Sequence, residues 1–139
     1  MPDFSAFASY RESAGLTCWP VPEEQGSDYE AGIVDIDGES WHIRTARTTP
    51  TKPGAFVAFW TRDRDGETAP FPLSEVGAGL LVLVEQDGRR GVFTFTPDLL
   101  TRLGITGKRG FRVYPSWCTG LNASATAAQR AQAPAFRTF

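Results

Sequence analysis

The chain has 139 residues, of which 41% are hydrophobic and 22% are charged, with a formal net charge of -2. This length suits one domain with a single core, and the composition excludes a transmembrane protein because no apolar run approaches a membrane span. One histidine and two distant cysteines, Cys18 and Cys118, exclude a multi-histidine metal site, a structural zinc site and a disulfide framework. We therefore expect reduced thiols, no metal and no cofactor.

Apolar spacing near the start of the chain predicts a helix. Phe7 and Ala8 follow Phe4 by three and four positions, the spacing of side chains on one face of a helix. Gly15 would end this helix. Residues 20–27 have the composition of a loop. The first residues lack the basic start and apolar stretch of an export signal, so we expect a cytoplasmic protein.

Three Asp-Gly pairs predict tight turns between alternating segments. Asp37-Gly38 would join a strand at 32–36 to one at 40–46, and Asp87-Gly88 would join 80–86 to 89–95. Residues 55–61 and 111–114 supply two further strands. The result is a mainly antiparallel sheet.

Two further helices follow. Thr96-Pro97 combines a capping hydroxyl with proline at the first helical position, and Gly104 would end this short helix. An alanine-rich helix begins at Asn122 and stops at Pro134. The predicted fold is one α+β domain over residues 1–139, with a mainly antiparallel twisted sheet of about five to six strands flanked by N- and C-terminal helices.

Charge is segregated along the chain. Residues 1–43 hold nine acids and one base, residues 44–98 hold seven of each, and residues 99–139 hold six bases and no acid. If the acid-free end of the chain packs beside the cations of the middle segment, one folded face is basic and attracts polyanions. Alternatively, the acidic first third of the chain neutralises that face.

The middle segment, residues 44–60, is the strongest candidate for a binding site. It contains three cations and four threonines before an apolar strand, without an intervening acid. Hydroxyl donors, fixed cations and Pro-Gly turns suit an oxyanion or a phosphate backbone, whereas the alternative is a rigid surface turn. Arg44 and Arg47 would point to opposite faces of a regular strand.

A second basic patch lies at Lys108, Arg109 and Arg112. Arg112 lies between Phe111 and Val113, so it should face away from the core. Trp117 follows in a loop and could expose its ring for stacking, whereas Trp60 ends a run of inward-facing residues and should be buried.

The two patches resemble the MepB-like family. The resemblance is carried by residues 49–60, Thr-Pro-Thr-Lys-Pro-Gly-Ala-Phe-Val-Ala-Phe-Trp, and by residues 110–117, Gly-Phe-Arg-Val-Tyr-Pro-Ser-Trp. The order and spacing of Asn122, Ala125, Gln129, Gln132 and Phe136 extend it, so that it covers most of the chain from about Glu30 onward. It implies a compact bacterial protein, often encoded beside a multidrug efflux pump and its repressor.

The leading hypothesis is a protein that binds nucleic acid without sequence specificity and prefers single strands. The basic loop and the C-terminal segment would form one groove. It would contact backbone phosphates through Arg44, Arg47, Thr49, Lys52, Lys108, Arg109 and Arg112, with Trp117 as a stacking ring.

The first alternative is an enzyme acting on a small anionic or nucleotide-like substrate, with Arg44, Lys52 and Arg112 as a clamp and Glu30 as base. Its scaffold could be nuclease-like with an eroded metal site, because His42 and Arg44 occupy the places of the acid and the lysine in a two-metal nuclease pattern. As a lone histidine on a strand, His42 is expected to be a structural residue that is either hydrogen-bonded or half-exposed. The second alternative is a protein-binding accessory factor. We expect no membrane partner.

Overall fold

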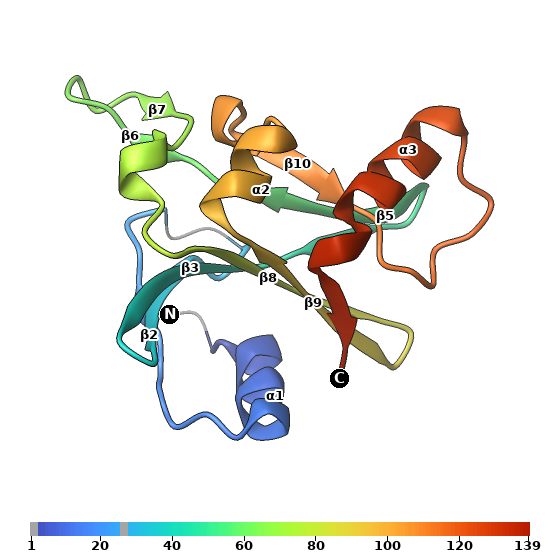
Figure 1. The fold of residues 1–139 in the computed structure, drawn as a ribbon, viewed down its shortest axis with the longest axis horizontal. Helices are drawn as coiled ribbons and strands as arrows, with labels where there is room; N and C mark the ends of the chain where they lie inside the picture. Colours follow the sequence, from blue (N-terminus) through green and yellow to red (C-terminus); the bar gives the residue numbers. More distant parts are fainter. Residues whose placement is uncertain (1–2, 26–27) are drawn as a thin grey trace.

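The structure, a computed structural model, describes residues 3–25 and 28–139. It has the predicted α+β architecture, with helices near both ends of the chain (Figure 1). The helices, including the 3-10 helices marked η, and the strands are, in chain order, α1 (Ser5–Ala14), β1 (Val21–Pro22), β2 (Gly32–Ile36), β3 (Glu39–Thr45), β4 (Arg47–Thr49), β5 (Lys52–Ala58), β6 (Thr61–Arg62), β7 (Thr68–Ala69), η1 (Leu73–Glu75), β8 (Gly79–Gln86), β9 (Arg89–Phe95), α2 (Pro97–Arg102), η2 (Ile105–Gly107), β10 (Gly110–Val113), α3 (Ala123–Gln132), η3 (Ala133–Ala135) and β11 (Phe136–Thr138).

The main sheet has six strands in the order β1-β2-β3-β8-β9-β11. Both predicted hairpins are confirmed. Asp37 and Asp87 adopt left-handed conformations with φ of 53° and 51°, and each is followed by glycine, as the two-residue turns of hairpins require. All neighbouring strands are antiparallel except the central pair β3 and β8, which the sequence did not predict to be parallel.

Both faces of the main sheet are covered, and β8 shows this directly. Leu81 and Leu83 pack with Phe7 of α1 on one face. Leu80 and Val82 point into the larger core on the other face. Figure 1 shows α1 on the opposite side of the sheet from β10, α2 and α3.

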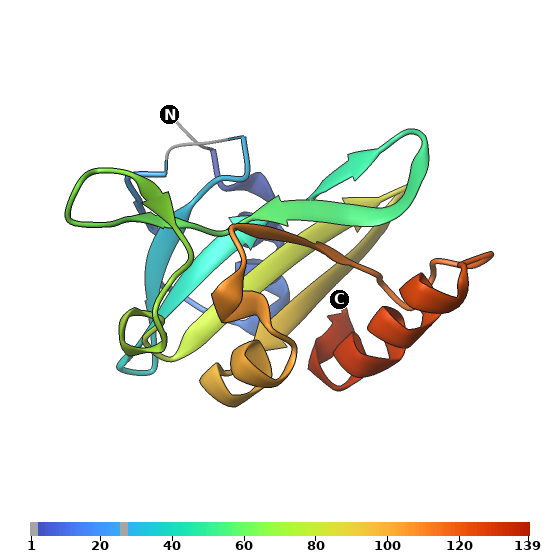
Figure 2. The same cartoon turned by 90° about the horizontal axis from the view of Figure 1, so that it is seen from above.

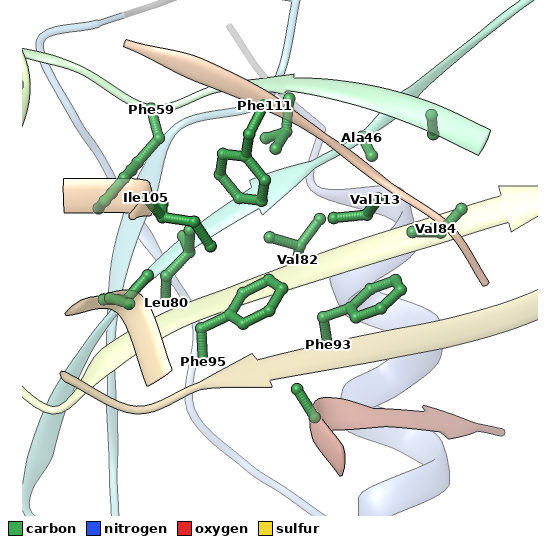
Figure 3. Packing of buried hydrophobic residues seen from close by; sticks show 14 of the residues in the cluster. Ala46, Phe59, Leu80, Val82, Val84, Phe93, Phe95, Ile105, Phe111 and Val113 are labelled. Atoms are coloured by element: carbon green, nitrogen blue, oxygen red, sulfur yellow. The ribbon is translucent and has the colours of Figure 1, made fainter. Parts of the chain in front are cut away.

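A second sheet, of three strands in the order β10-β5-β4, covers the larger core. Its inward-facing side chains include Phe111 and Val113, which pack with the main sheet (Figure 3). Val57 belongs to the same core cluster. The view from above shows β5 and β10 crossing the strands of the main sheet (Figure 2). This second sheet therefore pairs β5, from the middle of the chain, with β10, from near its end.

The helix signals are confirmed by their caps. The Thr96 hydroxyl accepts a hydrogen bond from the Leu99 backbone N–H at 3.3 Å, and the Asn122 side chain accepts one from Ala125 at 2.8 Å. Gly15 ends α1 in the left-handed conformation. The sequence missed β11, in which Phe136 begins a strand that pairs with β9.

Two expectations for residues 55–61 need correction, the bounds of the strand and the burial of Trp60. The strand predicted at 55–61 is β5, which begins at Lys52 and ends at Ala58. Trp60 therefore lies beyond the strand and is half-buried, with the Arg62 guanidinium 5.2 Å from its ring centroid.

Cys18 and Cys118 are unpaired and half-buried, as expected. Among the described residues, no helix combines the length and apolarity needed to cross a bilayer.

Candidate functional site

Strand pairing in the small sheet places two predicted cations in one row. Phe56 of β5 is opposite Arg47 of β4 on one side and opposite Arg112 of β10 on the other. The neighbours of this row, Ala55 and Val57, are fully buried, so Phe56 and its partners project from the opposite side of the sheet. We call this side, with Arg47, Thr49, Lys52, Phe56 and Arg112, the outer basic face.

Arg112 links the basic loop to the C-terminal segment. Its Nη2 donates a hydrogen bond to the Thr49 hydroxyl at 2.6 Å, across the intervening strand β5. Its Nε is buried and has no hydrogen-bond partner within residues 3–25 and 28–139. Thr49 is paired with Lys52 in the same sheet, so the two segments that were predicted to converge do lie together. They form an open sheet face at this point, where a groove had been predicted.

Two glycines allow aromatic rings to approach the backbone of the small sheet closely. A side chain at Gly110 would place its Cβ 2.5 Å from the Phe56 ring, and one at Gly54 would place it 2.8 Å from the Tyr114 ring. Gly54 also has φ of 76°, which favours glycine. The rings of Phe56 and Tyr29 meet edge to face at 6.1 Å. The outer basic face therefore carries aromatic surface between its cations.

The acidic first third of the chain neutralises only part of this face. Asp28 lies 3.7 Å from Arg47, and both side chains are exposed, by 82% and 56%. Within residues 3–25 and 28–139, no ion pair engages Lys52 or Arg112. Exposed pairs such as Asp28 with Arg47 contribute about 1 kcal/mol or less.

The other predicted residues of the C-terminal patch are distributed around the small sheet. Arg109 is exposed, and its Nε donates to the Thr68 carbonyl at 3.2 Å, toward β7. Lys108 is exposed and, with Arg112, lines a cavity of about 420 Å³ between α2 and α3. Trp117 is half-buried: its indole donates to Gln86 at 2.9 Å and its ring packs on Phe136, so it belongs to the border of the core.

Arg44 occupies a different environment from the one expected for a phosphate contact. Its side chain is completely buried, and its guanidinium donates to Glu23 at 2.6 Å and to Gln25 at 3.0 Å. It also lies 5.1 Å from the Phe59 ring centroid. Arg44 is therefore not part of the exposed basic surface.

His42 completes a buried polar cluster with Glu23 and Arg44. His42 Nδ1 lies 2.9 Å from Glu23 Oε1, and Nε2 lies 2.9 Å from the Glu75 carbonyl oxygen. Both ring nitrogens lie within hydrogen-bond distance of an oxygen of the surrounding protein. His42 is thus the hydrogen-bonded structural histidine that was expected.

The cluster changes the acid strength of its members. Burial alone would raise the pKa of Glu23, but the hydrogen bonds from His42 and Arg44 and their charges outweigh it and lower that pKa. Burial lowers the pKa of Arg44, although the hydrogen bond and charge of Glu23 oppose this. Glu23 is accordingly held as a carboxylate between two donors.

The structure does not bring together the residues suggested as an anion clamp and a base for an enzyme. The Glu30 carboxylate, the suggested base, accepts hydrogen bonds from the Phe4 backbone N–H at 2.6 Å and the Thr45 hydroxyl at 3.1 Å. Arg44, the suggested first arm, is committed to Glu23. Among the described residues, no three His, Cys, Asp or Glu side chains form a cluster that could hold a metal ion.

Glu23 and Gln25 are the polar residues that sequence reasoning missed. They lie in the segment predicted as a loop, where neither apolar period nor turn chemistry marks a side chain that enters the core. The one available signal was Arg44 itself, because a cation on a buried strand needs a carboxylate partner.

Comparison with known proteins gives the family. The family model described as MepB-like matches residues 23–138. This chain belongs to the MepB-like family. A solved structure titled "Crystal Structure of MepB" is similar in fold, with a TM-score of 0.85 and 32% identity, covering 99% of this chain and 97% of that chain. No curated protein shows significant sequence similarity. The matched region of this MepB-like protein includes both the buried cluster and the outer basic face.

Proposed function

We propose that this MepB-like protein binds single-stranded nucleic acid through the outer basic face, chiefly by contacts to backbone phosphates. The observation that carries the proposal is the cross-strand row of Arg47, Phe56 and Arg112. Its cations come from two distant parts of the chain, and an aromatic ring lies between them.

Cations and aromatic rings in this arrangement can contact two different parts of a nucleic acid, its phosphates and its bases. Guanidinium and ammonium groups bind phosphates, whereas aromatic rings stack on bases, each stack contributing about 1 to 3 kcal/mol. A duplex hides its bases from a flat sheet, so the half-buried rings of Phe56 and Tyr29 at this face favour single strands. The outer basic face presents no helix for insertion into a major groove, which is consistent with binding that does not depend on sequence.

The buried Nε of Arg112, which lacks an acceptor among the described residues, also supports nucleic-acid binding. A buried donor without an acceptor costs roughly 1 to 3 kcal/mol, and more when it is charged. Arg112 Nε is such a donor: it has no acceptor among the described residues, whereas Nη2 donates to Thr49. A phosphate that approached the face would offer acceptors to this guanidinium after a small side-chain movement.

Fluorescence anisotropy with a labelled thymidine homopolymer tests the proposal. Three cations at the face, Arg47, Lys52 and Arg112, predict a slope of log affinity against log salt of about -2. Replacing both Lys52 and Arg112 by alanine should reduce that slope by about 1.4 and weaken binding roughly tenfold at moderate salt.

The matched control is Arg64→Ala with Arg89→Ala, which removes the same charge from exposed positions in the β6–β7 and β8–β9 hairpins. The control should bind almost as well as the wild type. The proposal is wrong if the oligonucleotide fails to bind at low salt, or if both double variants lose affinity equally.

One observation favours protein binding as a second candidate. Val21 and Ile33 are paired across strands β1 and β2 at the edge of the main sheet, yet they are 68% and 38% exposed. Trp19, two residues before Val21, is 47% exposed. If these side chains form a partner's binding site, Val21→Lys should abolish a complex that survives nuclease treatment, whereas Lys52→Ala should leave it intact.

A further inference from the structure

A cavity of about 640 Å³ lies beside the C-terminal helix, apart from the row of cations on the small sheet. It is bounded by α3, by the edge strand β11 and by the loop that follows β10, and its lining includes Tyr114, Arg130, Ala133, Phe136 and Arg137. Cavities of about 300 to 1,000 Å³ with apolar walls and a few polar groups are typical binding sites for small molecules.

The apolar wall of this cavity is rigid. The Phe136 ring packs at 4.7 Å from the Phe93 centroid and at 5.5 Å from the Trp117 centroid. It also lies over Gly91, where a Cβ would come within 2.4 Å of the ring. An aromatic surface fixed in this way is available to a planar ligand without loss of side-chain entropy.

The loop that closes the cavity is held by a side-chain amide. Gln129 of α3 donates to the Pro115 carbonyl at 2.9 Å and to the Cys118 carbonyl at 3.2 Å. The backbone N–H of Tyr114 donates to buried Gln132 at 2.9 Å. The helix and the loop are thereby joined on both sides of Tyr114, so the cavity keeps its shape without a ligand.

The polar groups of the lining select for negative charge. Arg130 and Arg137 are exposed, and neither forms an ion pair with a carboxylate in the part of the chain that the structure describes. The elements that build this cavity all come after Asp98, the last acid in the sequence. An aromatic wall with two uncompensated guanidinium groups matches a flat ligand that carries an anionic substituent.

We propose that this cavity binds a small planar aromatic anion, a carboxylate or a phosphate ester, with its ring against Tyr114 and Phe136 and its charge near Arg130 and Arg137. The site is separate from nucleic-acid binding. Neither arginine belongs to the outer basic face, and Tyr114 lies over Gly54 at the border between the two.

Three isosteric probes test the charge preference: naphthalene-2-carboxylate, naphthalene-2-methanol and naphthalene-2-methylamine. Isothermal titration calorimetry, supported by saturation-transfer NMR, should give the anion a dissociation constant below about 1 mM. The alcohol should bind at least tenfold more weakly and the amine should not bind. Equal affinity for all three probes would overturn the proposal.

Two variants test the location. Arg130→Gln with Arg137→Gln should weaken the carboxylate roughly tenfold or more without affecting the fold, because both side chains are exposed. Ala133→Phe should fill the cavity and abolish binding of both the carboxylate and the alcohol. The matched control is Ala128→Phe, which adds the same ring on the face of α3 that lines the other cavity. Unchanged binding by the arginine variant, or equal losses from the two phenylalanine substitutions, would place the probe elsewhere and refute the site.

Discussion

Arg44 and Arg47 are three residues apart in sequence, yet they have opposite environments. Arg44 is completely buried and bonded to Glu23, whereas the Arg47 side chain is 56% exposed on the small sheet. The chain leaves the main sheet between them, where β3 ends and β4 begins. Cations that are close in the sequence therefore do not form one surface when a strand ends between them.

The largest expected effect comes from removing the buried cation. Among the described residues, Arg44→Met leaves the Glu23 carboxylate with His42 as its one side-chain partner, so the free energy of unfolding should fall by about 3 to 5 kcal/mol. Urea denaturation followed by circular dichroism measures this change. A loss below about 1 kcal/mol would show that the buried pair is not a stabilising element.

Glu23→Gln tests the same cluster from the other side and should cost about 3 kcal/mol at neutral pH. The folded pKa of Glu23 is lowered, so its contribution is present above the unfolded value of about 4.3 and is lost as the pH falls through the lower folded value. The difference in stability between wild type and variant should therefore stay constant from neutral pH to about pH 5 and shrink below about pH 4. A difference that grew on acidification would contradict the stated direction of the shift.

On the surface, Phe56→Leu should reduce oligonucleotide affinity about fivefold, equivalent to about 1 kcal/mol, because leucine keeps the apolar bulk but cannot stack on a base. Anisotropy measures the loss, and the salt slope should not change. Phe71→Leu, a ring replaced in the core, serves as the control and should alter stability rather than affinity.

The smallest effect is expected for Arg47→Ala. The free energy of unfolding should change by less than about 0.5 kcal/mol, because the one ion pair of Arg47 within the described part of the chain is with exposed Asp28. Oligonucleotide affinity should fall about threefold, and the salt slope should decrease by about 0.7. A stability loss comparable to that of Arg44→Met would remove the contrast between the two arginines.

Local chemistry explains what could be predicted of the fold. The turns at Asp37-Gly38 and Asp87-Gly88 and the caps at Thr96 and Asn122 depend on neighbouring residues alone, and all four are present. Pairing between distant segments leaves no comparable mark. The parallel contact of β3 with β8, the second sheet and the closing strand β11 were therefore missed.

The candidate site divides in the same way. Alternation along the late strand correctly placed Arg112 outside the core, because its neighbours Phe111 and Val113 are buried. The burial of Arg44 was not predicted because its partner, Glu23, comes from an irregular segment. The cavity beside α3 was also missed, since it forms only when the chain end returns to the sheet at Phe136.

The central parallel pair has a consequence for how fast the protein reaches its native state. Trp41 aligns with Gly79 and Thr45 with Leu83, so the two strands at the middle of the main sheet meet only after a long intervening segment has closed into a loop. The two tight-turn hairpins on either side, β2–β3 and β8–β9, need no such closure and can form within about 1 to 10 μs. Refolding should accordingly be limited by the docking of one hairpin against the other, in the slower range of non-local topologies.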